Sequence, residues 1–248
     1  MGVLVFSIVG YSVASILYTG HRVAEAEGTL NAVVSHQNSL NGTFGNIDAQ
    51  LSMLNTSGKF DSQQALMLVE LSIQNSNVAT RTIEADDRSL NTAAGDMRVA
   101  QWLSVMERGD LDRESSRVAH ARAALAIARV VAADQALDGQ FWHALYAGLA
   151  DYSAYSATSS PAALKSSSAE VAYAAQMSAY APGLPDDLRA LMTDLQVFLA
   201  DTARDTSVAG DLNRIAAYNI DTIGGEIDAF YRPMIDRYNS ELSAATAA

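Results

Sequence analysis

The chain has 248 residues, of which 49% are hydrophobic and 18% charged, with a formal net charge of −12 and no cysteine. This acidic balance argues against binding to nucleic acid, because a phosphate backbone would be repelled. The lack of cysteine excludes disulfides, thiolate metal sites and cysteine nucleophiles. Only four prolines and 7% aromatic residues occur, which favours long, closely packed helices over a sheet.

The first element along the chain is an uncharged apolar segment, residues 2–19. A helix of this length spans roughly 27 Å, close to the hydrocarbon thickness of a bilayer. We expect a transmembrane anchor over residues 1–20, in preference to a cleaved signal peptide, which needs a basic start, or a helix of a soluble core. Arg22 is the only cation that flanks the segment. No second apolar span appears in the sequence, so we expect a single-pass protein. The weak basic flank favours an extracytoplasmic body.

A heptad seam follows the apolar segment and predicts a helix that continues from the membrane span as one rod. Apart from the polar residue Gln37, its positions are apolar or small and lie three and four residues apart: Val23, Ala26, Leu30, Val33, Leu40, Phe44, Ile47, Leu51, Leu54. Turn formers at 55–58 end this helix, and a second helix runs from Asp61 or Ser62 to about Glu107. The short link predicts an antiparallel hairpin over residues 21–107.

Further helices are expected over residues 111–248. An alanine-rich helix over 111–137 is predicted to end at Asp138-Gly139, where a turn begins the next helix. The Ser-rich stretch that ends at Pro161 is expected to be a loop.

Prolines mark the remaining breaks. A helix over 162–180 ends before the turn at 182–185, and Pro185 followed by two aspartates starts another helix. Pro233 is expected to kink or end the last helix. The predicted fold is therefore all-α, with a transmembrane helix that continues into one elongated antiparallel bundle domain over 21–248.

Catalytic and metal-binding patterns are missing from the sequence. The four histidines make none of the spacings typical of metal sites: His21, His36, His120, His143. The sequence also lacks a Gly-x-Ser-x-Gly elbow and a phosphate-binding glycine loop. We therefore predict a non-enzymatic protein without cofactor or metal. His120 and His143 flank the expected turn and could approach each other, although filling half-buried space is their default interpretation.

Two side-chain groups are candidates for recognition. The charged stretch over 107–117 reads as a solvated helix start, and the alternative is an anion or partner surface. In that alternative Arg113 and Arg117, one helical turn apart, clamp an anion. An aromatic group is expected to pack in the core, with an exposed interface as its alternative: Trp142, Tyr146, Tyr152, Tyr155.

Three functions fit this layout. The first is a structural or interaction subunit of a membrane or cell-surface assembly, because another protein subunit can bury the heptad seam. The second is a sensor-type extracytoplasmic ligand-binding bundle, since a membrane helix followed by long antiparallel helices resembles the ectodomains of bacterial sensory receptors in architecture. The third is a pilin-like filament subunit with an apolar N-terminal helix. It ranks lower because Val5 stands where mature pilins usually have Glu.

Overall fold

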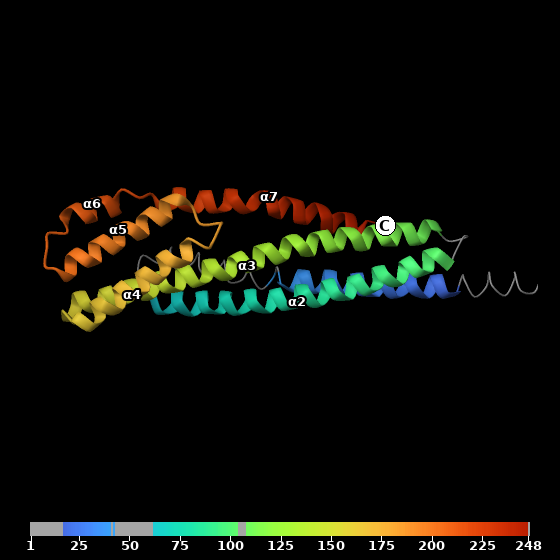
Figure 1. Cartoon of the computed structure of the whole chain (residues 1–248), viewed down its shortest axis with the longest axis horizontal. Coiled ribbons are helices and arrows are strands. Elements are labelled where there is room, and N and C mark those ends of the chain that lie inside the picture. The colour runs from blue at the N-terminus through green and yellow to red at the C-terminus, as the bar shows by residue number, and fades with distance from the viewer. Residues whose placement is uncertain (1–16, 41, 43–61, 104–107, 248) are drawn as a thin grey trace, which may run out of the picture. The chain divides into compact units, whose positions relative to one another are not determined.

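The structure of the protein, a computed structural model, describes residues 17–40, 42, 62–103 and 108–247 (Figure 1). Residues 17–40 are helical. The helices that follow are α2 (Ser62–Leu103), α3 (Arg108–Thr158), α4 (Pro161–Ser178), α5 (Asp186–Ala203), α6 (Ala209–Ala216) and α7 (Ile220–Thr246). No strand occurs in these ranges, which confirms the expected all-α fold.

Part of the expected N-terminal architecture lies outside the described residues. Only Leu17, Tyr18 and Thr19 of the apolar segment 2–19 are described. The seam positions from Phe44 to Leu54 and the expected turn at 55–58 also fall outside. Within the described ranges, no helix is both long enough and apolar enough to cross a bilayer.

The chain divides into two compact units, each assembled from separate stretches. Unit 1 comprises Met1–Asn41, Ala79–Val130 and Met234–Ala248, and unit 2 comprises Gly42–Val78 and Val131–Pro233. By sequence, unit 1 carries ten arginines against twelve carboxylates, a formal charge of −2. Unit 2 carries six cationic side chains against sixteen carboxylates, a formal charge of −10. The acidity of the chain therefore belongs mainly to unit 2.

Unit 1 is a closed set of four antiparallel helical segments, in which each segment contacts two neighbours. The helix over 17–40 pairs with α2, α2 with α3, α3 with α7, and α7 with the helix over 17–40. The helix over 17–40 contacts α2 through Arg22–Asp96 and His36–Asp86, and α2 contacts α3 through Arg122–Asp87 and Gln101–Asp112. Helix α3 contacts α7 through Arg117–Ala245 and His120–Glu241. Helix α7 contacts the helix over 17–40 through Tyr238–Gln37. Since the paired numbers run in opposite directions, residues 17–22 lie at the same end of unit 1 as Ala245.

The middle of the heptad seam is buried inside unit 1, whereas its first position, Val23, and its last described position, Leu40, are half-buried. Ala26, Leu30, Val33 and Gln37 are all at most 3% exposed. Gln37, the polar interruption of the seam, accepts a hydrogen bond from the Tyr238 hydroxyl at 3.3 Å. The seam prediction is thus confirmed over this range, and the chain itself supplies the partner helices.

The predicted break at Asp138-Gly139 is wrong, because both residues lie inside α3, one continuous helix of 51 residues. Gly139 is buried where a Cβ atom would lie 2.6 Å from Ile73 Cγ1 of α2. The glycine therefore serves close helix packing within unit 2 and does not end a helix. Similarly, Gly148 faces Val171 of α4, and its carbonyl accepts a hydrogen bond from the Ser167 hydroxyl at 2.8 Å.

The proline and serine signals have mixed outcomes. The expected Ser-rich loop is only two residues long, because α3 continues to Thr158 and Pro161 begins α4. The break at 182–185 and the helix start after Pro185 are confirmed. The last predicted helix is two helices, α6 and α7, and Pro233 lies inside α7 without ending it.

The core of unit 2 joins five elements. Its largest cluster combines side chains of α3, α4, the turn at 182–185, α5 and α7, among them Phe141, Met177, Leu184, Met192 and Ile223. The Arg189 guanidinium reinforces the turn by donating to the carbonyls of Ser178 at 2.9 Å and Ala181 at 3.0 Å. Ser178 is the last residue of α4 and Ala181 lies just beyond it, so the arginine acts as a side-chain cap for this end of the helix.

Candidate ligand-binding groove

A groove of about 410 Å³ lies between α2 and α3 in unit 1. Its volume falls within the range typical of small-molecule sites. Residues of α2 at 83, 84, 87 and 88 share one helix face, as do residues of α3 at 122, 125, 126 and 129. The side chains that line it are Ile83, Glu84, Asp87, Arg88, Arg122, Leu125, Ala126 and Arg129. Ile83 and Leu125 are buried and give the groove an apolar floor.

Three arginines line the groove, and only one of them forms an ion pair with a carboxylate in the described ranges. Arg122 Nε donates to Asp87 Oδ1 at 2.9 Å, which joins α2 to α3 and balances one guanidinium. Arg88 Nε donates only to the Glu84 backbone carbonyl, at 3.0 Å. Neither Arg88 nor Arg129 forms an ion pair with a carboxylate in the described ranges. Two guanidinium groups without an ion pair in these ranges therefore line the groove together with the Glu84 carboxylate, and the three arginines outnumber the two carboxylates of the lining.

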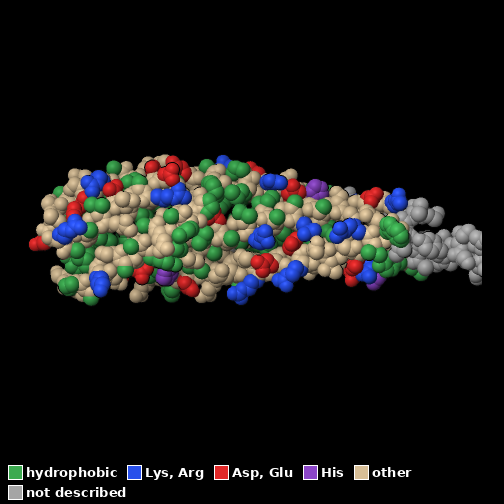
Figure 2. All heavy atoms as spheres, viewed as in Figure 1, with side chains coloured by type: hydrophobic (Ala, Val, Ile, Leu, Met, Phe, Trp, Pro, Cys, Tyr) green, Lys and Arg blue, Asp and Glu red, His purple; other side chains and the backbone are tan. Residues whose placement is uncertain are grey.

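This arrangement is suited to binding a small anion. A guanidinium offers several donors in a fixed plane, which matches the oxygens of a carboxylate or phosphate. The apolar floor would contact a short hydrocarbon body, while Asp87 holds Arg122 in place. On the face drawn in Figure 2, cationic and acidic side chains are interspersed. Three arginines in the lining of one groove are therefore a local concentration of positive charge.

The predicted pair Arg113 and Arg117 is placed elsewhere on α3. Arg113 forms an exposed ion pair with Asp110 at 3.1 Å. Arg117 is largely buried and donates to Glu114 Oε2 and to the Ala245 carbonyl, both at 2.9 Å. An anion that used Arg117 would have to displace these two acceptors. The internal ion pairs expected at this helix start are present, and the Arg113–Asp110 pair is exposed as expected, but the Arg117–Glu114 pair is largely buried.

The histidines are distributed without meeting. His36 Nδ1 lies 2.9 Å from Asp86 Oδ1, and His120 Nδ1 lies 2.8 Å from Glu241 Oε2. The approach of His120 to His143 is not seen, because the turn expected between them is replaced by the continuous helix α3. In the part of the chain that the structure describes, no three side chains of His, Asp or Glu are grouped to hold a metal ion.

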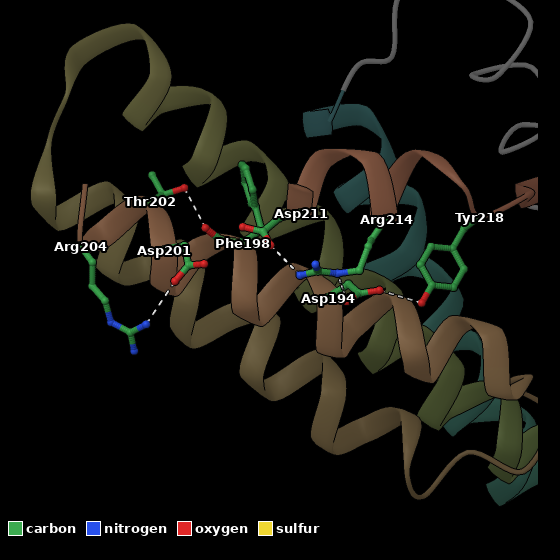
Figure 3. A network of polar contacts seen from close by, with 8 residues as sticks. All are labelled: Asp194, Phe198, Asp201, Thr202, Arg204, Asp211, Arg214 and Tyr218. Atoms are coloured by element: carbon green, nitrogen blue, oxygen red, sulfur yellow. Dashed lines mark hydrogen bonds and ion pairs between the residues drawn. The ribbon is translucent and has the colours of Figure 1, made fainter. Parts of the chain in front are cut away.

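Unit 2 contains a second cavity, of about 560 Å³, beside α5 and α6. Figure 3 shows its main cation, Arg214, between two carboxylates, with ion pairs of 3.0 Å to Asp194 and 2.5 Å to Asp211. The Tyr218 hydroxyl also donates to Asp194, at 2.9 Å. Because Arg214 already pairs with a carboxylate of α5 and a carboxylate of α6, this network stabilises the packing of α6 on α5.

A buried acidic group lies between α3 and α7 within unit 2. The Tyr231 hydroxyl is 2.5 Å from Asp134 Oδ2 and 3.0 Å from Asp138 Oδ2. Burial, and next the neighbouring Asp134 charge, raise the pKa of Asp138 to about 6, although the hydrogen bond from Tyr231 lowers it. The pKa of Tyr231 is also raised, first by burial. Asp138 therefore keeps its proton to a higher pH than an aspartate in solvent does.

The aromatic residues pack as expected. Trp142 and Tyr146 lie against buried clusters of unit 2, with Trp142 edge-on to Phe141 at 5.0 Å between ring centroids. Tyr152 and Tyr155 pack against the cluster around Phe198. All four side chains are half-buried and pack against the core clusters, as the core interpretation predicts.

Comparison with known proteins gives no relative: no protein-family model, curated protein or solved structure matches this chain. The groove was missed at the sequence level, although a signal existed. Arg122 and Arg129 are seven residues apart, and therefore lie on one face of α3 with Leu125 between them. Arg88 lies beside them because α2 packs antiparallel to α3 with Asp87 opposite Arg122, and the sequence does not give this register.

Proposed function

We propose that the protein is a non-enzymatic, membrane-tethered binding protein of the sensor type, whose unit 1 holds a small organic anion in the α2–α3 groove. The observation that carries this proposal is that Arg88 and Arg129 line one cavity and have no carboxylate partner among the described residues, next to Arg122, which is held by Asp87. Two guanidinium groups that form no ion pair with the described carboxylates, above an apolar floor, favour binding of a carboxylate with a short aliphatic body.

The assembly interpretation is less favoured because its main ground is weakened. It rested on a heptad seam that another subunit could bury. Over residues 17–40 the seam is already covered by α2 and α7 of the same chain, with Leu30 only 1% exposed. A binding module needs no second chain to satisfy this helix.

The tether is proposed to be the apolar segment 2–19. The helix over 17–40 begins at the end of unit 1 where α7 finishes, so unit 1 would stand on the bilayer at that end. An extracytoplasmic body fits the scarcity of cations next to the segment. This arrangement leaves the middle of the α2–α3 face, where the groove lies, accessible to solvent.

Calorimetric titration of the full chain in detergent micelles tests the binding site. The probes are sodium acetate, succinate, glutamate and phosphate, with sodium chloride as the control for ionic strength. We expect saturable binding of at least one carboxylate, weakened about tenfold or more by Arg129→Gln and by Arg88→Gln, since a charge-assisted hydrogen bond contributes about 1.5–3 kcal/mol.

Arg98→Gln is the matched control, because it removes the same charge from an exposed position of α2 outside the groove. Binding in this variant should equal that of the parent chain. If no probe binds, or if all three variants lose affinity equally, the groove is not a ligand site. Saturable binding of phosphate alone would retain the anion site and overturn the organic ligand.

A further inference from the structure

An exposed apolar group lies at the end of unit 1 where the helix over 17–40 begins. Trp102 is 87% exposed, and Leu17 and Val99 are 69% and 52% exposed. Val99 and Trp102 are three residues apart on α2 and share one face of the helix. Burying a tryptophan side chain is strongly favourable, so exposure to this extent calls for a partner surface.

The helix register fixes the height of Trp102 relative to the apolar segment. Arg22 pairs with Asp96 at 3.1 Å, and Trp102 lies six residues farther along an antiparallel helix. It is therefore close to the level of Leu17, the first described residue of the helix over 17–40. Counted from the His36–Asp86 contact of 2.9 Å, the residue level with Trp102 is Gly20. Both pairs place Trp102 at the end of the segment 2–19.

The surrounding side chains have the composition of a membrane interface. Tyr18 stacks under the Arg22 guanidinium, with 5.2 Å from Cζ to the ring centroid. His21 and Arg98 are exposed at the same end. Tryptophan and tyrosine concentrate where hydrocarbon meets headgroups, and arginine side chains extend from there toward the phosphates.

We propose that Trp102, with Val99 and Leu17, inserts into the interfacial layer of the lipid bilayer and forms a second membrane contact on α2. This inference rests on the proposed tether, because only a membrane-inserted segment 2–19 brings the bilayer surface to the height of Trp102. The contact fixes unit 1 at two points, one on the helix over 17–40 and one on α2. Two contacts restrict its tilt more than a single contact would.

The test uses the full chain reconstituted in phosphatidylcholine vesicles. Flotation in a density gradient first reports whether the chain is membrane-bound. Trp142→Phe then leaves Trp102 as the single tryptophan, and its fluorescence is compared in vesicles with lipids brominated near the headgroup or deep in the acyl chain. We expect Trp102 to be quenched about twofold or more by the shallow bromines and less by the deep ones.

Trp102→Phe is the matched control, because the remaining Trp142 packs in the core of unit 2 and should be quenched by neither lipid. If Trp142→Phe does not fold, the difference between the parent chain and Trp102→Phe gives the same information. A chain that floats while Trp102 stays unquenched overturns the second contact and leaves the tether standing. A chain that does not float overturns both.

Discussion

The Tyr231 hydroxyl of α7 lies 2.5 Å from Asp134 Oδ2 of α3 and donates a hydrogen bond to this carboxylate. Asp134 is only 5% exposed. Asp138 competes for the same hydroxyl from one helical turn away, at 3.0 Å. Because a phenol has one proton to donate, only one of the two carboxylates can be fully satisfied at a time.

Stability should therefore fall as the pH rises through about 6. The folded state raises the pKa of Asp138 from 3.8 to about 6, so between these values it binds a proton that the unfolded chain has released. Ionisation above pH 6 costs the folded state on the order of 1–2 kcal/mol, since one pKa unit corresponds to about 1.4 kcal/mol and Asp138 keeps some solvent contact.

Urea unfolding of the full chain in micelles between pH 4 and 8 measures this slope. Asp138→Asn should be more stable than the parent near pH 8 and should lose that advantage near pH 4. Asp228→Asn, at an exposed position of α7, should leave the pH profile of the parent unchanged. Parallel profiles for the parent and Asp138→Asn would contradict the raised pKa of Asp138.

The two glycines Gly139 and Gly95 should respond to alanine in opposite directions. At Gly139 a Cβ atom would lie 2.6 Å from Ile73, so alanine forces the two helices apart and should cost about 1–3 kcal/mol. At Gly95 a Cβ atom meets nothing within 4 Å, so alanine should stabilise α2 by up to about 1 kcal/mol. Thermal unfolding followed by circular dichroism checks both. Equal shifts at the two positions would show that α2 and α3 do not approach at Ile73.

Removing Arg117 should be far more costly than removing Arg113. Arg117→Gln leaves the Glu114 side chain, only 4% exposed, without its ion pair, and the Ala245 carbonyl without its donor. We expect a loss of about 2–4 kcal/mol in the free energy of unfolding. Arg113→Gln removes an exposed pair and should change it by less than about 0.5 kcal/mol. Denaturant titration of both variants decides this, and similar values would mean that Arg117 is not a structural residue.

Ser159 should be improved by glycine. It has φ of 54° at the junction between α3 and α4, in the left-handed region where a Cβ atom is unfavourable. Ser159→Gly should raise the free energy of unfolding by about 0.5–1 kcal/mol. Ser156→Gly, in the last turns of α3, should lower it by about the same amount. The midpoint of thermal unfolding gives the sign of each change.

Local signals predicted the elements whose ends depend on local chemistry. Pro161 and Pro185 begin or precede helices as expected, because their fixed φ and missing N–H act within one turn. The seam over 17–40 was also found, since its period is set by one buried face. These features need no knowledge of which helix lies next to them.

The failures share a dependence on distant residues. Gly139 resembles a helix end until Ile73, 66 positions earlier, is placed against it. Pro233 inside α7 lies between Tyr231 and Tyr238, whose hydroxyls bond to α3 and to the helix over 17–40, so tertiary contacts on both sides maintain the helix. The groove arginines come from two helices, and their convergence requires the register of α2 on α3.

The closure of unit 1 by α7 also sets an order of folding. The Tyr238–Gln37 contact joins residues 201 positions apart, and His120–Glu241 spans 121 positions. In contrast, the contacts of α5 with α4 and α6 are between neighbours in the chain. During synthesis the local contacts of α4, α5 and α6 can form first, because short loops close at lower entropic cost. The seam on the helix over 17–40 therefore stays incompletely covered until α7 has emerged, and this interval is when a nascent chain is most exposed to aggregation or to a chaperone.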